Sequence, residues 1–226
     1  MFRGATLTPL RLTLPPASCA SWLNALSPLD GRSHPLTELS LSAVDVLQVV
    51  ADSALGPLLQ AALGPVPWCN LSQSWLRHGQ PPHSWHQDGA LRHDFMAHHG
   101  QAPPPGSALD MRTAWIALTP CGEFAPSLEW ADTVQTRLLT PTELTDAHVA
   151  AAHAGHPFVQ AFMAAGDVLL FDGLLLHRTY LSAAMSQRRA SLELRFFRGD
   201  RLPPRVAGDV GLRLPLPRAR ASAWGG

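Results

Sequence analysis

The chain has no lysine, few cysteines and no excess of charge of either sign. All 17 basic side chains are arginines, and 17 acidic side chains balance them to a formal net charge of zero. A balanced charge gives no electrostatic reason to expect nucleic acid or an anionic membrane as a partner. We therefore expect a small-molecule substrate. The oligomeric state is not indicated by the sequence.

The three cysteines, Cys19, Cys69 and Cys121, lack the Cys-x-x-Cys spacing, which argues against a disulfide framework and a thiolate zinc site. The first twenty residues are interrupted by an arginine and a pair of prolines, so they make a poor signal peptide. Residues 53–76 carry no charge, but their prolines and amide side chains argue against a membrane span. A cytoplasmic protein with free thiols is the expectation.

At 226 residues, the chain is long enough for one domain with a sizeable core. Residues 1–65 are predicted to form a helical support. In this part Ser18 is a candidate N-cap for a helix that reaches Leu26, and residues 41–64 have helical periodicity with a break at Gly56-Pro57. Residues 66–198 are predicted to form a β core, followed by an arginine-rich extension over residues 199–226.

Within the β core, short apolar runs are separated by glycine and proline, which is typical of a mainly β fold such as a jelly roll, with two sheets face to face and a cavity at one end. The long loop over residues 91–110 is a candidate lid that orders when substrate binds. A short helix over residues 142–152 is expected in a second flap. The predicted strands cover residues 67–77, 83–88, 112–119, 134–140, 158–164, 167–171, 174–179 and 188–197.

The stretch PPHSWHQDG, residues 81–89, places His86 and Asp88 two positions apart. In an extended strand such residues share a face, so that an imidazole and a carboxylate can converge on one metal ion. A mononuclear non-haem iron centre needs a second histidine. His177 is the candidate, because it ends an apolar strand that opens at a Gly-Asp turn.

The segment that follows His177 predicts a strand with alternating character. Its even-numbered apolar residues should face a core, whereas Ser191, Glu193 and Arg195 should face water. By the same alternation Arg188 should project into a cavity and Arg189 should face outward. A buried guanidinium can hold a carboxylate with two hydrogen bonds.

The ordered set WHQD, MRTAWIAL, GDVLLFDGLLLH and RRA, with the first arginine of RRA eleven residues after the histidine, resembles the phytanoyl-CoA dioxygenase family. Part of the pattern is also similar to the ectoine hydroxylase branch. The resemblance covers residues 68–198. It implies a cupin-like double-stranded β-helix with flanking N-terminal helices, and an oxygenase that uses Fe(II), 2-oxoglutarate and O2, with ascorbate as a candidate stimulant.

The resemblance also implies roles for single residues. Iron would be held by His86, Asp88 and His177, and the far carboxylate of 2-oxoglutarate by Arg188. Additional cosubstrate-binding candidates are Thr179, which assists the arginine in relatives, together with Gln73 and Trp115. The expected reaction is hydroxylation of an unactivated C–H bond with decarboxylation of 2-oxoglutarate to succinate.

Two departures from the family pattern concern the pocket. The chain reads CGEFAPSLEWAD after the central strand, and it lacks the asparagine that usually follows the distal histidine. The substrate is therefore not implied by the resemblance.

Two other classes stay open at this point. His83 forms a His-x-x-His pair with His86, and His98 and His99 could add ligands, which would suit a zinc-dependent hydrolase. Alternatively, the chain could be a non-catalytic jelly-roll protein that binds a metal or ligand. The remaining histidines of the second flap, His148, His153 and His156, are expected at the surface.

Overall fold

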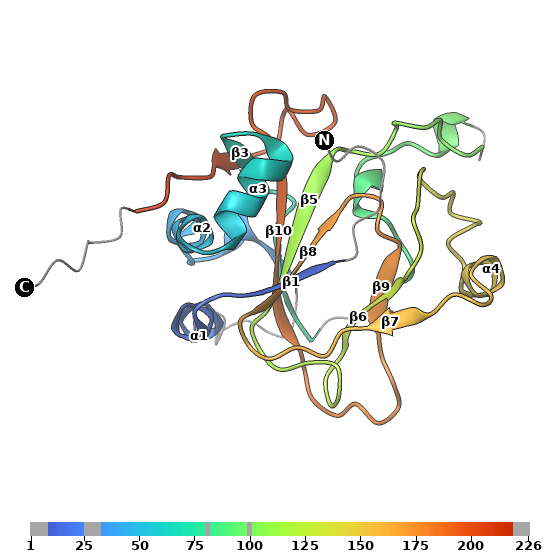
Figure 1. Ribbon diagram of the computed structural model, residues 1–226, viewed down its shortest axis with the longest axis horizontal. Coiled ribbons are helices and arrows are strands. Elements are labelled where there is room, and N and C mark those ends of the chain that lie inside the picture. Colours follow the sequence, from blue (N-terminus) through green and yellow to red (C-terminus); the bar gives the residue numbers. More distant parts are fainter. Residues whose placement is uncertain (1–8, 25–32, 80–81, 99–100, 219–226) are drawn as a thin grey trace, which may run out of the picture.

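The computed structural model describes residues 9–24, 33–79, 82–98 and 101–218. Two antiparallel sheets lie opposite each other, and the N-terminal helices cover the outside of the larger one (Figure 1). The prediction of a mainly β jelly roll with flanking helices is confirmed. The division into one domain with three parts stays a prediction.

The larger sheet has eight strands, of which the central one is β10 (Ala190–Arg198), paired with β5 on one side and with β3 and β4 on the other. The path through this sheet is β1 (Leu10–Thr13), β8 (Asp167–Asp172), β5 (Met111–Ala117), β10, β3 (Pro67–Asn70) and β11 (Gly211–Arg213), with β4 (Trp75–His78) joining β10 to β2 (His34–Pro35). The smaller sheet runs β7 (Phe158–Gln160), β6 (Ser127–Ala131) and β9 (His177–Tyr180).

Helix α1 (Pro16–Asn24), helix α2 (Ala43–Asp52) and helix α3 (Leu55–Leu63) pack against the larger sheet. The Ser42 hydroxyl accepts a hydrogen bond from the Asp45 amide and caps the start of α2. Shorter helical turns are η1 (Leu36–Glu38), η2 (Asp88–Ala90), η3 (Met96–His98) and α4 (Asp146–Ala152), which lies within the helix predicted over residues 142–152.

The helix boundaries correct two details of the prediction. Ser18 lies inside α1, which already begins at Pro16, and Leu26 is outside the described residues. The break between α2 and α3 falls at Ser53 and Ala54. Gly56 lies within α3, at a position where a Cβ would come within 2.6 Å of the Ala51 carbonyl oxygen. The proline after it lies in the first turn, where a helix tolerates it.

The two faces of β10 are both buried, contrary to the prediction that its odd-numbered residues face water. Leu192, Leu194 and Phe196 belong to the hydrophobic core shared with the helices. The odd-numbered Ser191, Glu193 and Arg195 point to the space between the sheets and are 0%, 8% and 7% exposed. The alternation itself was read correctly. Its outer face is covered by helices and its inner face lies opposite the second sheet, so both are largely buried.

Other strand predictions were wrong in detail. Residues 83–88 pair only through a single bridge at His86, and residues 134–140 form turns and loops. The prediction missed β6, which is the centre of the smaller sheet, and β1 at the edge of the larger sheet. Both are only four or five residues long, so each gives little periodicity to detect.

The chain after β10 adds to the larger sheet, since β11 pairs with β3 and Leu214 is buried in the core. Among the described helices, none is long and apolar enough by itself to cross a membrane. The pair α2 and α3 reaches that length and composition only when taken together, with a bend of 91° between them.

Candidate metal centre between the two sheets

His86 and His177 are brought together by their own main chains. The His86 amide donates to the His177 carbonyl oxygen at 2.9 Å, and the His177 amide donates to the His86 carbonyl oxygen at 3.1 Å. Such a reciprocal pair sets the two residues directly opposite each other on antiparallel segments. Their side chains therefore lie on the same side, with ring centroids 4.2 Å apart.

Each histidine uses one ring nitrogen to fix its orientation. His86 Nδ1 lies 2.7 Å from the Ser84 carbonyl oxygen, and His177 Nδ1 lies 3.0 Å from the Leu175 carbonyl oxygen. A carbonyl oxygen can only accept, so both Nδ1 atoms carry the proton. Both Nε2 atoms are left with a lone pair for a metal.

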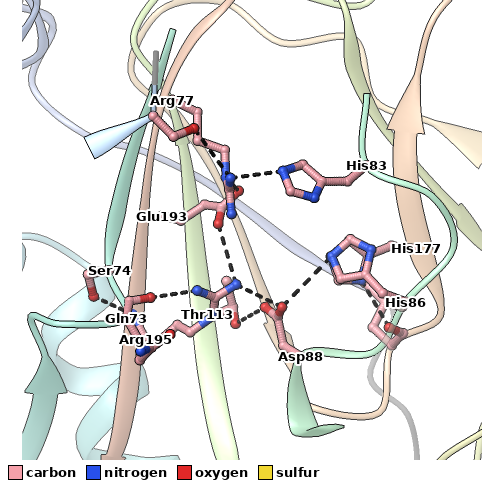
Figure 2. A network of polar contacts seen from close by, with 12 residues as sticks. Gln73, Ser74, Arg77, His83, His86, Asp88, Thr113, His177, Glu193 and Arg195 are labelled. Atoms are coloured by element: carbon pink, nitrogen blue, oxygen red, sulfur yellow. Dashed lines mark hydrogen bonds and ion pairs between the residues drawn. The ribbon is translucent and has the colours of Figure 1, made fainter. Parts of the chain in front are cut away.

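Asp88 completes the cluster from the start of η2. Its Oδ2 accepts a hydrogen bond from the Thr113 hydroxyl at 2.6 Å, and its Oδ1 accepts one from Arg195 Nη2 at 2.9 Å. Thr113 and Arg195 are register partners on β5 and β10. One cross-strand pair on the inner face of the larger sheet therefore orients the carboxylate from both of its oxygens (Figure 2).

The loop that carries Asp88 approaches a second turn very closely. The Gly89 amide donates to the Gly173 carbonyl oxygen at 2.7 Å. A Cβ on Gly89 would lie 2.7 Å from that oxygen, and a Cβ on Gly173 would lie 2.9 Å from Gly89 Cα. Only glycine at both positions allows this approach.

The Gln87 side chain points away from His86 and Asp88 and hydrogen-bonds to two other loops. Its Nε2 donates to the carbonyl oxygens of Arg137 at 3.1 Å and Leu174 at 2.9 Å, and its Oε1 accepts from the Leu139 amide at 2.7 Å. The side chain is 3% exposed. Gln87 therefore adds side-chain anchors to a segment whose main chain pairs with β9 only around His86.

Together, ligand atoms of His86, Asp88 and His177 lie within 4.8 Å of one another (Figure 2). Desolvation, followed by the adjacent His177 ring, lowers the pKa of His86 to about 4, so this ring is neutral at physiological pH. Burial alone would raise the pKa of Asp88, but Arg195 and the two histidines outweigh it and hold that pKa well below its usual value. Two neutral imidazoles and one carboxylate are a donor set that suits a divalent transition metal.

A chain of alternating charges continues from Asp88 along the inner face of the larger sheet. Arg195 also lies 3.4 Å from Glu193 Oε2, and Glu193 Oε1 accepts a hydrogen bond from Arg77 Nε at 2.6 Å. Burial would raise the pKa of Glu193, but the guanidinium groups of Arg77 and Arg195 lower it on balance, so the carboxylate is ionised.

His83 lies at the outer end of this chain. Its Nε2 is 2.8 Å from Arg77 Nη1, which makes the imidazole the acceptor. Burial, followed by the Arg77 cation, lowers the pKa of His83 to about 4. The His-x-x-His pair with His86 therefore does not form a metal site, and His83 is not part of the ligand cluster. His99 and the side chain of His98 lie outside the described residues.

The two arginines at the start of β10 have the opposite environments to those predicted. Arg188 is exposed, with its Cδ atom against Gly79, whereas Arg189 is 6% exposed. Arg189 precedes the inner-facing Ser191 by two residues, and its guanidinium lies over the Trp115 ring at 5.4 Å. The prediction was wrong because it assigned the even-numbered face of the strand to the cavity.

Three buried polar groups near the start of β10 lack a hydrogen-bond partner among the described residues: Arg189 Nη1, Trp115 Nε1 and Ser191 Oγ. Ser191 follows Arg189 on the same face, and Trp115 lies beneath the Arg189 guanidinium. Buried donors without partners are rare in native proteins. Arg189 Nη1 is the charged donor among them, and a carboxylate is the acceptor that pairs best with a guanidinium.

The other predicted cosubstrate residues lie close to the cluster. Thr179 is buried on the same side of β9 as His177, and its hydroxyl accepts a hydrogen bond from the His83 amide at 3.1 Å. The Gln73 carbonyl oxygen accepts from Arg195 Nη1 at 2.5 Å, and its side chain lines a cavity.

That cavity has a volume of about 560 Å³ and opens beside the cluster. Its wall includes two of the three candidate ligands together with charged, amide and aromatic side chains. The lining residues are Ser33, Gln73, Trp75, Arg77, His83, His86, Gln87, Asp88, Leu91 and Arg195.

Four residues of the site were missed by the sequence analysis: Thr113, Glu193, Arg195 and Gln87. The two charged residues were assigned to a solvated face, and the structure buries them. Thr113 lies in a strand that was predicted, but only its pairing with β10 brings its hydroxyl to Asp88. The sequence signal that could have identified the charged pair is the placement of Glu193 and Arg195 at alternate positions of a strand that is otherwise mainly apolar.

The surface histidines of the second flap agree with the prediction for His148 and His156, which are exposed, while His153 is half-buried. His153 Nδ1 lies 3.2 Å from the Thr133 hydroxyl. None of the three belongs to the ligand cluster among the described residues.

Comparison with known proteins gives one family and several solved structures. A family model described as phytanoyl-CoA dioxygenase (PhyH) matches residues 34–190. No curated protein matches the chain.

The solved structures are similar in fold at low sequence identity. AviO1 from Streptomyces viridochromogenes Tue57 has 19% identity and a TM-score of 0.53, covering 89% of this chain and 94% of its own. EctD from S. alaskensis with bound Fe has 18% identity and a TM-score of 0.58, covering 86% of this chain and 73% of its own. SnoN, a non-heme alpha ketoglutarate dependent epimerase from nogalamycin biosynthesis, has 15% identity and a TM-score of 0.56, covering 93% and 91%.

Proposed function

Because the chain belongs to the phytanoyl-CoA dioxygenase family, we propose that it is an Fe(II)- and 2-oxoglutarate-dependent oxygenase that hydroxylates an unactivated C–H bond of a small molecule. The observation that carries this proposal is the convergence of His86, Asp88 and His177 within 4.8 Å. These residues come from two segments far apart in the sequence and meet beside a cavity.

In this proposal His86 Nε2, His177 Nε2 and one oxygen of Asp88 would hold the iron, a three-ligand set that leaves other positions for the reactants. When bound, iron and 2-oxoglutarate use O2 to oxidise the substrate, with release of carbon dioxide and succinate. The carbonyl contacts of the two Nδ1 atoms keep each Nε2 unprotonated and correctly oriented. Thr113 and Arg195 restrict the rotation of the carboxylate.

We assign the anchor of the far cosubstrate carboxylate to Arg189 in place of Arg188. A buried guanidinium and two adjacent unpartnered donors, from Trp115 and Ser191, support this assignment. Exposure of Arg188 argues against that residue. The carboxylate would bind by charge-assisted hydrogen bonds in a site with little access to water, where such bonds are strong.

The primary substrate would occupy the cavity beside Asp88. Gln73, Trp75 and Leu91 offer an amide, an aromatic ring and an apolar side chain on its wall. EctD has been solved with 2-oxoglutarate and 5-hydroxyectoine, whereas SnoN is an epimerase and SnoK a carbocyclase. Hydroxylation is therefore one of several oxidative outcomes on this fold, and it is the one that we propose.

Anaerobic titration of the purified protein with Fe(II) and then 2-oxoglutarate tests the proposal. We expect a coloured charge-transfer band to form only when both are present, with an end point of one iron per chain. Admission of O2 should then convert 2-oxoglutarate to succinate, slowly without the primary substrate. His177→Ala should abolish the band.

Other results would favour the other classes. A protein that binds Zn(II) but forms no coloured complex with Fe(II) and 2-oxoglutarate would support a zinc hydrolase. A coloured complex that never turns over 2-oxoglutarate in O2 would support a non-catalytic binding protein. Either result would contradict the proposed oxygenase.

A further inference from the structure

The inner face of β10 carries a buried carboxylate that is neither a candidate metal ligand nor part of the cosubstrate anchor. Glu193 is 8% exposed and ionised between two arginines. Resting on the proposed function, we propose that Glu193 is a positioning residue of the metal centre. Its negative charge offsets the guanidinium that holds Asp88, and thereby allows a divalent cation to bind beside that guanidinium.

Arg195 does not need Glu193 to keep its position. Its Nη1 donates to the Gln73 carbonyl oxygen at 2.5 Å and its Nη2 to Asp88 Oδ1 at 2.9 Å. The contact to Glu193 is longer, at 3.4 Å. Arg195 would therefore orient Asp88 even without the carboxylate, and the contribution of Glu193 is mainly its charge.

The charges around Asp88 show why an offset is needed. Two guanidinium groups, Arg77 and Arg195, border the cavity, and Glu193 bonds to both. A divalent cation takes up the charge of Asp88, which then no longer balances Arg195. Without Glu193, the cation would face two unbalanced positive groups in a partly dry site, where repulsion between like charges is poorly screened.

Glu193→Gln tests this inference, with Mn(II) as the probe. The variant keeps the shape of the side chain and removes the charge. We expect Mn(II) to bind the metal-free protein about tenfold more weakly than it binds the wild type, the scale typical of outer contacts to metal ligands. Titration calorimetry without 2-oxoglutarate or O2 measures this affinity independently of turnover.

Two further variants test the direction in which charge changes the Mn(II) affinity. Arg77→Gln leaves Glu193 opposite a single cation, so Mn(II) should bind severalfold more tightly than to the wild type. The double variant Arg77→Gln/Glu193→Gln removes one charge of each sign and should return the affinity to within about threefold of the wild type. Loss of a merely structural contact would instead weaken binding in all three.

Glu129→Gln is the matched control. Glu129 is also 8% exposed and pairs with an arginine, Arg178 Nε, at 2.7 Å. However, Arg178 lies on the face of β9 opposite to His177 and over the Trp85 ring. The Mn(II) affinity of Glu129→Gln should therefore equal that of the wild type.

The outcomes separate this inference from the proposed function. Wild-type-like Mn(II) affinity in Glu193→Gln, or weaker binding in Arg77→Gln, would overturn the role of Glu193 while the oxygenase proposal stands. Absence of metal binding in the wild type would overturn the proposed function itself. If Glu193→Gln does not fold, as judged by circular dichroism, the affinities of Arg77→Gln and of the double variant still decide the question.

Discussion

Arg188 and Arg189 are adjacent in sequence and differ completely in surroundings. Arg188 is exposed, and Arg189 is buried over Trp115 with an unpartnered Nη1 among the described residues. Desolvation lowers the pKa of Arg189, with Glu193 acting in the opposite direction, which is the signature of a cation held in a dry site. Burial of an unpaired cation costs folding free energy, and a bound anionic ligand would offset that cost.

We expect Arg189→Gln to weaken 2-oxoglutarate binding by about 10- to 100-fold, because a charge-assisted pair of hydrogen bonds is lost. The measurement is the 2-oxoglutarate dependence of the charge-transfer band under anaerobic conditions. Arg188→Gln is the control and should leave that dependence unchanged.

Stability provides a second readout for the same pair. Removal of a buried and incompletely paired cation should leave the free energy of unfolding of Arg189→Gln no lower than that of the wild type. If Arg188→Gln loses cosubstrate affinity and Arg189→Gln does not, the assignment made from the sequence pattern is the better one.

At this scale the sequence predicts the candidate ligands well and their supporting residues poorly. His86, Asp88 and His177 were recognisable because their residue types and order are distinctive, and the structure brings them together. Arg195 and Glu193 were assigned to solvent because charged residues in alternation usually lie there. Their burial depends on a second sheet, which local alternation cannot reveal.

At the scale of elements, the loop that carries His86 and Asp88 is held mostly by contacts outside regular secondary structure. Gln87 makes three hydrogen bonds to main-chain groups of the loops that contain Leu139 and Leu174. The loop after β6 is fixed further by Glu143, which pairs with Arg137 and accepts from the Thr140 amide. The side-chain hydrogen bond from Arg137 is the main reason that the pKa of Glu143 falls to about 2.

We expect Gln87→Met to lower the free energy of unfolding by about 2 to 4 kcal/mol, since buried main-chain groups lose their partners while the side-chain volume is kept. Chemical denaturation of the metal-free protein measures this. Gln48→Met is the control, because the Gln48 amide makes only exposed hydrogen bonds, to Asp52 and to the Leu216 carbonyl oxygen. It should change stability by less than about 0.5 kcal/mol. Equal effects in the two variants would contradict the anchoring role of Gln87.

The same contacts show why residues 134–140 do not form the predicted strand. The segment reads VQTRLLT, in which apolar and polar residues do not alternate strictly. The Leu139 amide bonds to the Gln87 side chain, so its partner is an amide side chain and not a neighbouring strand.

At the scale of the whole molecule, one sheet separates two different environments. Its outer face and the helices form an apolar core that contains Leu59 and Leu192. Its inner face carries the charged and polar residues of the site, opposite the smaller sheet (Figure 1). The site thus lies only on the inner face, beside a second apolar cluster that includes Trp115 and Phe171, and the core shared with the helices lies on the outer face.

This separation predicts that a cavity in the outer core affects folding and leaves the site intact. Leu59 on α3 is 0% exposed, and Leu59→Ala should lower the free energy of unfolding by about 2 to 5 kcal/mol. At a temperature where the variant is folded, its Mn(II) affinity should match that of the wild type. A parallel loss of metal affinity would show that the two faces are coupled.

The class of fold was predictable because strand-like runs, turn residues and an ordered set of motifs all indicated a jelly roll. The order of strands was not, since it depends on pairings between distant segments such as β1 with β8 and β11 with β3. Short edge strands contribute little periodicity and are recognised mainly by what they pair with.

The reciprocal main-chain bonds between His86 and His177 have a consequence for how the centre could change over time. Peptide groups make these bonds whatever side chains are attached, so the two facing positions would persist after either imidazole was exchanged. The main-chain topology therefore fixes where these two side chains lie. Which donor atoms they offer depends only on the residues encoded at the two positions.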